Sequence, residues 1–183
     1  MLLPFAALLI AAKAAPVPPP LPSIVAPPEI VANRANHLFL ELSTGGKVEI
    51  VLRPDLAPNH IQRIQTLVRR GFYNGLTFHR VIPGFMAQGG DPKGTGEGGS
   101  DLPDLKAEFT QVPFMRGSLG AARATSPDSA NSQFFIMYAP HPELDGAYTV
   151  MGRVVAGMDA VDAIAPGEPP TEATKIVRAY LGG

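Results

Sequence analysis

Short apolar runs separated by turn-forming residues recur along the chain, and this pattern constrains the fold more than any other feature. Residues 38–42 and 47–52 carry apolar side chains two positions apart, and Thr44-Gly45-Gly46 lies between the two runs. Alternating runs joined by a short glycine-containing turn are typical of a β-hairpin. Further short apolar runs occupy residues 76–82, 85–88, 133–138, 150–155 and 175–181. The sequence therefore predicts many short strands.

Helical spacing is confined to two segments. The first begins at Pro58 and places Ile61, Ile64 and Leu67 on one face, and the second covers residues 158–164; proline suits a first helical turn. A sheet of short strands invites aggregation unless it closes on itself or is covered. We therefore expect a mainly β fold, a β-barrel capped by two α-helices. Because 183 residues are typical of a single domain, we expect one domain.

Residues 1–14 form an apolar run that is too short to span a bilayer. The run ends in Ala12-Lys13-Ala14, which has the small-x-small form of a signal cleavage site, although only the amino terminus supplies a positive charge before it. We expect a signal peptide over residues 1–14, export to the periplasm or secretion, and no stable membrane insertion after cleavage. The alternatives are an uncleaved membrane tether and a cytoplasmic protein.

Residues 15–35 are rich in proline, with seven prolines between positions 16 and 28. Proline removes backbone donors and fixes φ, which favours an extended polyproline II conformation over a packed element. This segment is expected to be a tether, with binding to a proline-reading module as the alternative. The folded domain is expected over residues 36–183.

Composition excludes several classes of function. The formal charge is −1 and the basic residues are dispersed, so no surface neutralises a phosphate backbone and no nucleic-acid partner is expected. The absence of cysteine excludes disulfides, thiolate nucleophiles and thiolate zinc sites. The histidines neither cluster nor show helical spacing, so neither a metal nor a cofactor is expected; they are His37, His60, His79 and His141.

Two other patterns suggest chemistry but lack its context. Residues 94–99 fit G-x-G-x-x-G, yet Ser100-Asp101-Leu102-Pro103 follows where a nucleotide site needs a helix, so a surface loop is expected. A hydrolase triad could combine His141 with Asp128 and with Ser129 or Ser132. No nucleophile elbow surrounds either serine, which disfavours hydrolysis.

The stretch FHRVIPGFMAQGGD, residues 78–91, places the permanently charged Arg80 in an otherwise mostly apolar run, with Gln88 as its polar companion. In a strand, Arg80 shares a face with Phe78 and Ile82. Periodicity alone favours an arginine at the barrel rim, with its stem packed and its guanidinium in water.

Three stretches together resemble the cyclophilin family of peptidyl-prolyl cis-trans isomerases. They are FHRVIPGFMAQGGD, GSLGAARATSPDSANSQFFI and ELDGAYTVMGRVVAGMDAVDAI, and the resemblance extends from Asn36 to Leu181. It implies a closed eight-stranded antiparallel barrel with two capping helices. It also implies a monomer that assists folding by acting on proline-containing, unfolded or extended polypeptides.

Matching positions carry the family's roles onto this chain. Arg80 corresponds to the catalytic arginine, and Gln88 to the glutamine that orients this arginine and meets the substrate backbone. The substrate-binding positions are Phe85, Met86, Ala122, Gln133, Phe135, Leu144 and Tyr148. Three residues depart from the best-known eukaryotic pattern, which has tryptophan, histidine and asparagine where this chain has Glu143, Tyr148 and Arg123. Without the tryptophan, weak cyclosporin binding is expected.

These residue types suit rotation about an X-Pro bond. A guanidinium can donate to the prolyl nitrogen, which gains a lone pair only when the bond is twisted, so the transition state is bound preferentially. An apolar pocket holds the ring. Three other readings stay open: His79 as a general base, a non-catalytic peptide-binding or chaperone module, and a lipocalin-like carrier. The carrier needs a hollow barrel, which large alternating side chains disfavour.

Overall fold

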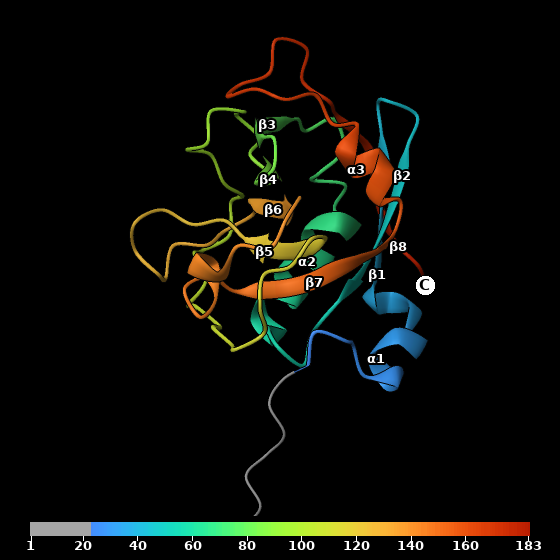
Figure 1. Cartoon of the computed structure of the whole chain (residues 1–183), viewed down its shortest axis with the longest axis vertical. Helices are drawn as coiled ribbons and strands as arrows, with labels where there is room; N and C mark the ends of the chain where they lie inside the picture. Colours follow the sequence, from blue (N-terminus) through green and yellow to red (C-terminus); the bar gives the residue numbers. More distant parts are fainter. Residues whose placement is uncertain (1–22) are drawn as a thin grey trace, which may run out of the picture.

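The computed structural model describes residues 23–183, and its centre is one antiparallel sheet of eight strands (Figure 1). The order across the sheet is β3-β4-β6-β5-β7-β2-β1-β8. The strands are β1 (His37–Leu42), β2 (Lys47–Leu52), β3 (Phe78–Ile82), β4 (Met86–Gly89), β5 (Ser118–Ala121), β6 (Phe134–Met137), β7 (Val150–Ala156) and β8 (Ile176–Leu181). The signal peptide predicted over residues 1–14 lies outside the described residues.

The predicted hairpin is present as β1 and β2. Its register pairs Leu38 with Ile50 and Leu40 with Val48, and all four side chains are buried. The turn between the strands includes Gly45 with φ +86°, a conformation that glycine adopts without strain. The alternation of the sequence thus sets which face of this hairpin meets the core.

The sheet curls, but it is not shown as the closed barrel that was predicted. The end strands β3 and β8 are not paired along their lengths; only the first residue of each strand bonds to residues that lie just before the other strand. Gly75 donates its N–H to the Ile176 carbonyl at 2.7 Å, Ile176 donates to Leu76 at 2.8 Å, and Phe78 donates to Thr174 at 2.9 Å. The strand count and the antiparallel arrangement agree with the prediction, whereas full closure by strand pairing does not.

Both predicted helices are present, as α2 (Pro58–Arg69) and α3 (Met158–Asp162). α2 has proline in its first turn and buries Ile61, Ile64, Leu67 and Val68, the amphipathic pattern of a surface helix. α2 packs against β8, and α3 packs against β2. The structure also contains two short 3₁₀ turns, η1 (Arg34–Asn36) and η2 (Pro142–Leu144).

Large apolar side chains fill the inside of the sheet. Leu40, Ile50, Phe78, Leu119 and Ile136 belong to one buried cluster, which leaves the interior to side chains rather than to a ligand. Other buried apolar residues form a second, smaller cluster. Its buried members are Leu56, Met86, Val112, Phe114, Ala122, Phe135, Met137 and Val150.

Residues 23–35, named here the N-terminal strap, lie against the domain. The strap contains a short helix, α1 (Pro28–Ala32), beside β1 in Figure 1. Arg53 Nη1 donates to the Ser23 carbonyl at 2.9 Å, and His37 Nε2 lies 2.7 Å from the Val31 carbonyl. This part of the segment expected to be a tether is therefore hydrogen-bonded to β1 and to the end of β2. Within residues 23–183, no helix has the length and apolar character needed to cross a membrane.

Candidate active site

The β3–β4 hairpin places Arg80 beside Gln88. The two residues are direct partners across the strands, so their side chains share one face of the sheet. The turn between the strands contains Gly84 with φ +75°, and Phe85 donates its N–H back to the Ile82 carbonyl at 3.0 Å. Residues 78–89, which belong to the stretch that contains Arg80, therefore form a tight hairpin. This hairpin carries four of the predicted site residues.

Eight of the nine predicted site residues surround one small pocket of about 120 Å³. Its lining residues are Arg80, Phe85, Met86, Gln88, Ala122, Arg123, Phe135, Leu144 and Tyr148. They come from β3, β4 and the turn between them, from β6 and η2, and from the segments that follow β5 and η2. The arrangement places two cations, Arg80 and Arg123, beside walls of mainly apolar and aromatic side chains, which suits a small apolar group attached to a polar backbone.

Gln133, the ninth residue, lines an adjoining pocket of about 500 Å³. Gln88, Ala122 and Arg123 line both pockets, so the two form one continuous groove. Gln88 Nε2 donates to Gln133 Oε1 at 2.9 Å, and Gln133 Nε2 donates to the carbonyls of Gly96 and Gly98 at 2.9 and 2.8 Å. These bonds fix both amides at the floor of the groove.

The aromatic wall of the small pocket depends on a glycine that the sequence reasoning missed. Phe135 stacks on Phe114 with ring centroids 5.6 Å apart. Gly120, its neighbour on β5, has no room for a side chain, because a Cβ there would collide with both the Phe135 and the Phe114 rings. Gly120 therefore lets Phe135 lie flat against the strand.

Two of the departures from the eukaryotic pattern contact each other. The Arg123 guanidinium lies 4.5 Å from the centroid of the Tyr148 ring, a cation–π geometry. Arg123 also donates to the carbonyls of Ala124, Thr125 and Ala147, and Tyr148 meets Phe135 edge-on at 5.8 Å. The pair thus forms one wall of the pocket.

Glu168 is the acidic partner of Arg80, and sequence reasoning did not find it. Arg80 Nε donates to Glu168 Oε2 at 2.7 Å. Gln88 was expected to orient the arginine, but within residues 23–183 no hydrogen bond joins these two side chains; Gln88 donates to Gln133 instead. Glu168 lies in a loop of small residues and prolines that resembles a linker in sequence, which hid its role.

A backbone bridge brings Glu168 to this place. Val81 and Gly167 form an antiparallel pair with N–H···O distances of 2.8 and 2.9 Å, so residues 80 and 168 lie opposite each other. In Figure 1 this loop, between α3 and β8, lies next to β3. Gly167 has φ +143°, and a Cβ there would lie 2.6 Å from Pro170 Cα, so glycine is needed at the bridge.

The glycine loop 94–99 is built around the carboxylate of Asp91. Lys93, Thr95 and Gly96 donate backbone N–H groups to it at 2.7, 2.9 and 2.6 Å. Burial favours the protonated form, but these bonds together lower the pKa of Asp91 below its ordinary value. The loop's amides are thus engaged by an internal anion, which agrees with a surface loop rather than a nucleotide site.

The serines and the histidine considered for a hydrolase triad form hydrogen bonds with other groups. Ser132 Oγ donates to the Gly90 carbonyl and Ser129 Oγ to the Ser126 carbonyl, while His141 Nδ1 lies 2.6 Å from Glu143. No triad is assembled among these described residues. His79 is buried, and burial lowers its pKa, partly opposed by Asp91.

The family model described as cyclophilin type peptidyl-prolyl cis-trans isomerase/CLD matches residues 39–181. The chain belongs to this family. A probable peptidyl-prolyl cis-trans isomerase of Brucella suis is 54% identical over 147 residues, which cover 74% of each chain. Peptidyl-prolyl cis-trans isomerase B of Bacillus subtilis is 43% identical over 132 residues, covering 71% of this cyclophilin and 91% of the relative.

Solved cyclophilins share the fold. The crystal structure of cyclophilin AquaCyp293 from Hirschia baltica has a TM-score of 0.75 at 29% identity, covering 81% of this chain and 74% of that one. A cyclophilin type isomerase of Cryptosporidium parvum, crystallised in the presence of the dipeptide Ala-Pro, has a TM-score of 0.74 at 27% identity; the match covers 80% of this cyclophilin and 99% of that chain.

Proposed function

We propose that this cyclophilin catalyses rotation about X-Pro bonds in proline-containing, unfolded or extended polypeptides, and so assists their folding. One observation carries the proposal: Arg80 borders a small pocket with apolar and aromatic walls, and within the described residues only its Nε donates a hydrogen bond. Four N–H groups of its two terminal nitrogens are therefore available to a substrate.

The chemistry requires only that the twisted amide be favoured over both planar forms. Rotation meets a barrier of about 18–20 kcal/mol because amide resonance is lost. At the twisted geometry the prolyl nitrogen becomes pyramidal and acquires a lone pair. A donor aimed at that lone pair stabilises the transition state and not the planar ground states. We assign this role to Arg80.

The apolar walls hold the ring while the bond turns. Phe85, Met86, Phe135 and Leu144 supply these walls, and Met86 and Phe135 are themselves buried. A pocket that excludes water strengthens the hydrogen bond from the guanidinium. The adjoining pocket around Gln133 would take the residues before the proline, with Gln88 facing the peptide backbone.

Glu168 is assigned a positioning role. Its carboxylate binds Nε, which leaves the terminal nitrogens unengaged and limits rotation of the planar fork. The Val81–Gly167 bridge attaches this carboxylate to the same strand that carries Arg80. The donor is thus preorganised by a fixed partner, and preorganisation is what makes such a donor effective.

The cellular setting remains part of the proposal. The apolar run 1–14 and its small-x-small end support export to the periplasm or secretion. We also propose a monomer with weak affinity for cyclosporin, the latter because Glu143 stands where a tryptophan is expected. Amino-terminal sequencing of the exported protein would test the cleavage after Ala14.

Exchange spectroscopy by NMR tests the activity. A proline-containing tetrapeptide has separate cis and trans resonances because uncatalysed interconversion takes tens to hundreds of seconds. Catalytic amounts of the protein are expected to produce exchange cross-peaks and line broadening. Binding of the peptide without exchange would instead indicate a non-catalytic peptide-binding module.

A further inference from the structure

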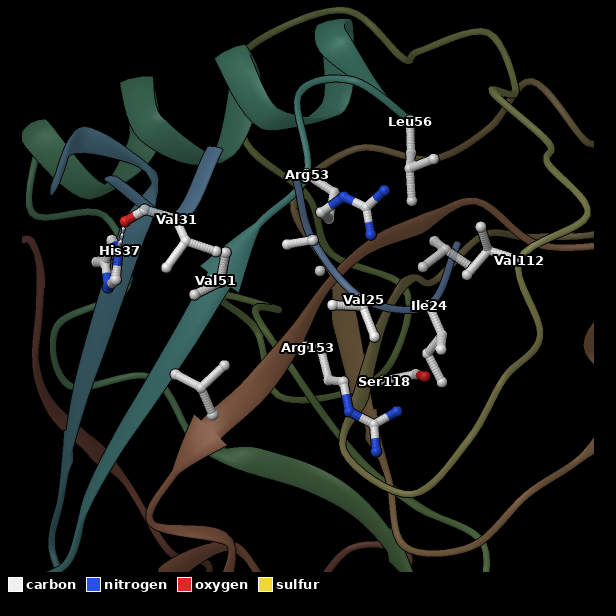
Figure 2. Close-up of a pocket in the computed structure, with 14 residues that line it drawn as sticks. Ile24, Val25, Val31, His37, Val51, Arg53, Leu56, Val112, Ser118 and Arg153 are labelled. Atoms are coloured by element: carbon white, nitrogen blue, oxygen red, sulfur yellow. Dashed lines mark hydrogen bonds between the residues drawn. The ribbon is translucent and has the colours of Figure 1, made fainter. Parts of the chain in front are cut away.

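A second pocket, of about 430 Å³, lies between the N-terminal strap and the outer face of the sheet. Its floor includes a row of four residues on adjacent strands: His37 pairs with Val51, Val51 with Arg153, and Arg153 with Ser118. Direct partners share one face of a sheet, and all four line the pocket. Figure 2 shows Val25 and Ile24 of the strap in front of this floor.

The strap is fixed at both ends and therefore forms a roof. Arg53 holds the Ser23 carbonyl, and at the other end His37 holds the Val31 carbonyl while Asn36 Nδ2 donates to Ile30 at 3.1 Å. Between these anchors, Ile24, Val25 and Ala26 contribute side chains to the pocket. The space beneath the strap is therefore lined by apolar side chains of both the strap and the sheet, which suits an alkyl group.

The lining is mostly apolar, and part of it faces solvent. Val25 is 72% exposed, Val155 56% and Val31 42%, and all three line the pocket. Clustered exposed apolar side chains at the mouth of a cavity mark an interaction site more than isolated ones do. A peptide is disfavoured as the occupant, because these walls offer few partners for its backbone N–H and C=O groups.

Of the two arginines that line the pocket, only Arg53 forms an ion pair with a carboxylate among the described residues. Arg53 donates to both carboxylate oxygens of Asp55, at 2.7 to 3.2 Å. Arg153 has no carboxylate within 4.0 Å among the described residues, and its Nη1 is shielded from solvent without a hydrogen-bond partner there. A guanidinium that borders a mostly apolar pocket without a carboxylate partner is complementary to an anionic ligand group.

We propose that this pocket binds a small amphipathic carboxylate with an unbranched alkyl tail. The carboxylate pairs with Arg153 beside Ser118, and the tail runs beneath the strap along Val25, Val51 and Val155. The volume is within the range of roughly 300–1,000 Å³ typical of small-molecule sites. None of these residues lines the pocket next to Arg80, so the site is independent of the proposed isomerase activity.

Binding of decanoate to the full chain tests the proposal by titration calorimetry and by methyl NMR shifts. We expect shifts at Val25, Val51 and Val155, and decanol is expected to bind at least about tenfold more weakly because it lacks the charge. Arg153→Met keeps the apolar stem and should weaken decanoate binding at least about tenfold. Arg178→Met, an exposed arginine of β8, is the matched control and should leave it unchanged.

Two further variants guard against misfolding of Arg153→Met and test whether the ligand binds at the Arg80 site instead. Val155→Asp places a like charge at the exposed mouth and should also weaken decanoate binding, which keeps the test valid if Arg153→Met does not fold. Arg80→Ala should not alter binding. The proposal is overturned if decanoate does not bind, if Arg153→Met or Val155→Asp binds as tightly as the wild type, or if Arg80→Ala abolishes binding.

Discussion

Glu168 accepts a hydrogen bond of 2.7 Å from Nε of Arg80, although the two residues are 88 positions apart in the sequence. Both side chains are about half-exposed, at 42% for Arg80 and 52% for Glu168. An exposed ion pair contributes little to folding stability. We therefore expect its importance to lie in the orientation of the guanidinium rather than in the stability of the domain.

Removal of the Glu168 carboxylate should reduce turnover and leave stability unchanged. We expect Glu168→Gln to lower kcat about two- to fivefold with little change in KM, because a positioning contact of this strength is worth up to about 1 kcal/mol. Glu168→Asp should recover part of the loss. Glu172→Gln, an exposed residue of the same loop, is the control. Equal kcat in Glu168→Gln and wild type would remove Glu168 from the mechanism.

Gly120→Ala should destabilise the domain and displace one wall of the pocket next to Arg80. The added Cβ meets the rings of Phe135 and Phe114, and forcing extra volume into a packed region typically costs about 1–3 kcal/mol. Chemical denaturation should report this loss, and kcat/KM should fall because the pocket wall is displaced. A variant with wild-type stability and activity would show that Phe135 can move without consequence.

The activity is expected to be independent of pH from roughly pH 6 to 9, because an arginine does not titrate in that range. Burial lowers the pKa of His79, which moves its titration toward the acidic end of this range or below it. The measurement is kcat/KM on a proline tetrapeptide across the range. A decline as the pH drops through about 6.5 would point to a histidine acting as a general base.

His141 should titrate above its ordinary value. The hydrogen bond to Glu143 raises the pKa of His141, and the same bond lowers that of Glu143. The stabilisation by His141 is complete below about pH 6.5 and is lost as the pH rises through its folded pKa. That by Glu143 is complete above about pH 4.3 and is lost as the pH falls through its folded pKa.

An NMR titration of the His141 ring protons measures this pKa directly. Glu143→Gln should bring the pKa of His141 back toward its ordinary value, while the pKa of His79 should not change, since other neighbours set it. An unchanged His141 pKa in this variant would mean that the 2.6 Å contact is not made in solution.

Sequence patterns predicted those strands and helices whose formation depends on residues that are close in the sequence. The hairpin of β1 and β2 and the helix α2 follow from alternation and helical spacing. The two strands of the hairpin that pairs Arg80 with Gln88 correspond to the predicted apolar runs 76–82 and 85–88. Closure of the sheet was overestimated, because the pairing of its end strands depends on contacts between residues about 100 positions apart, which periodicity does not encode.

The residues that sequence patterns did not indicate act through contacts with residues that are distant in the sequence. Glu168 reaches Arg80 through the bridge between Val81 and Gly167, and Gly120 matters because of a ring on the neighbouring strand. The strap was expected to be a tether from its prolines, yet hydrogen bonds to Arg53 and His37 hold it on the sheet. No spacing rule within the segment itself could have indicated these partners.

The role of Arg80 is tested by kcat/KM of Arg80→Ala on a proline-containing tetrapeptide, with Arg80→Lys alongside and the melting temperature as a check on folding. Loss of a preorganised donor of this kind typically costs about 10²- to 10³-fold, and we expect a loss of that order in a protein that remains folded. Arg80→Lys keeps the charge but not the planar fork, so it should recover only part of the activity. A near-normal kcat/KM in folded Arg80→Ala would contradict the assignment of Arg80 as the residue that stabilises the twisted amide.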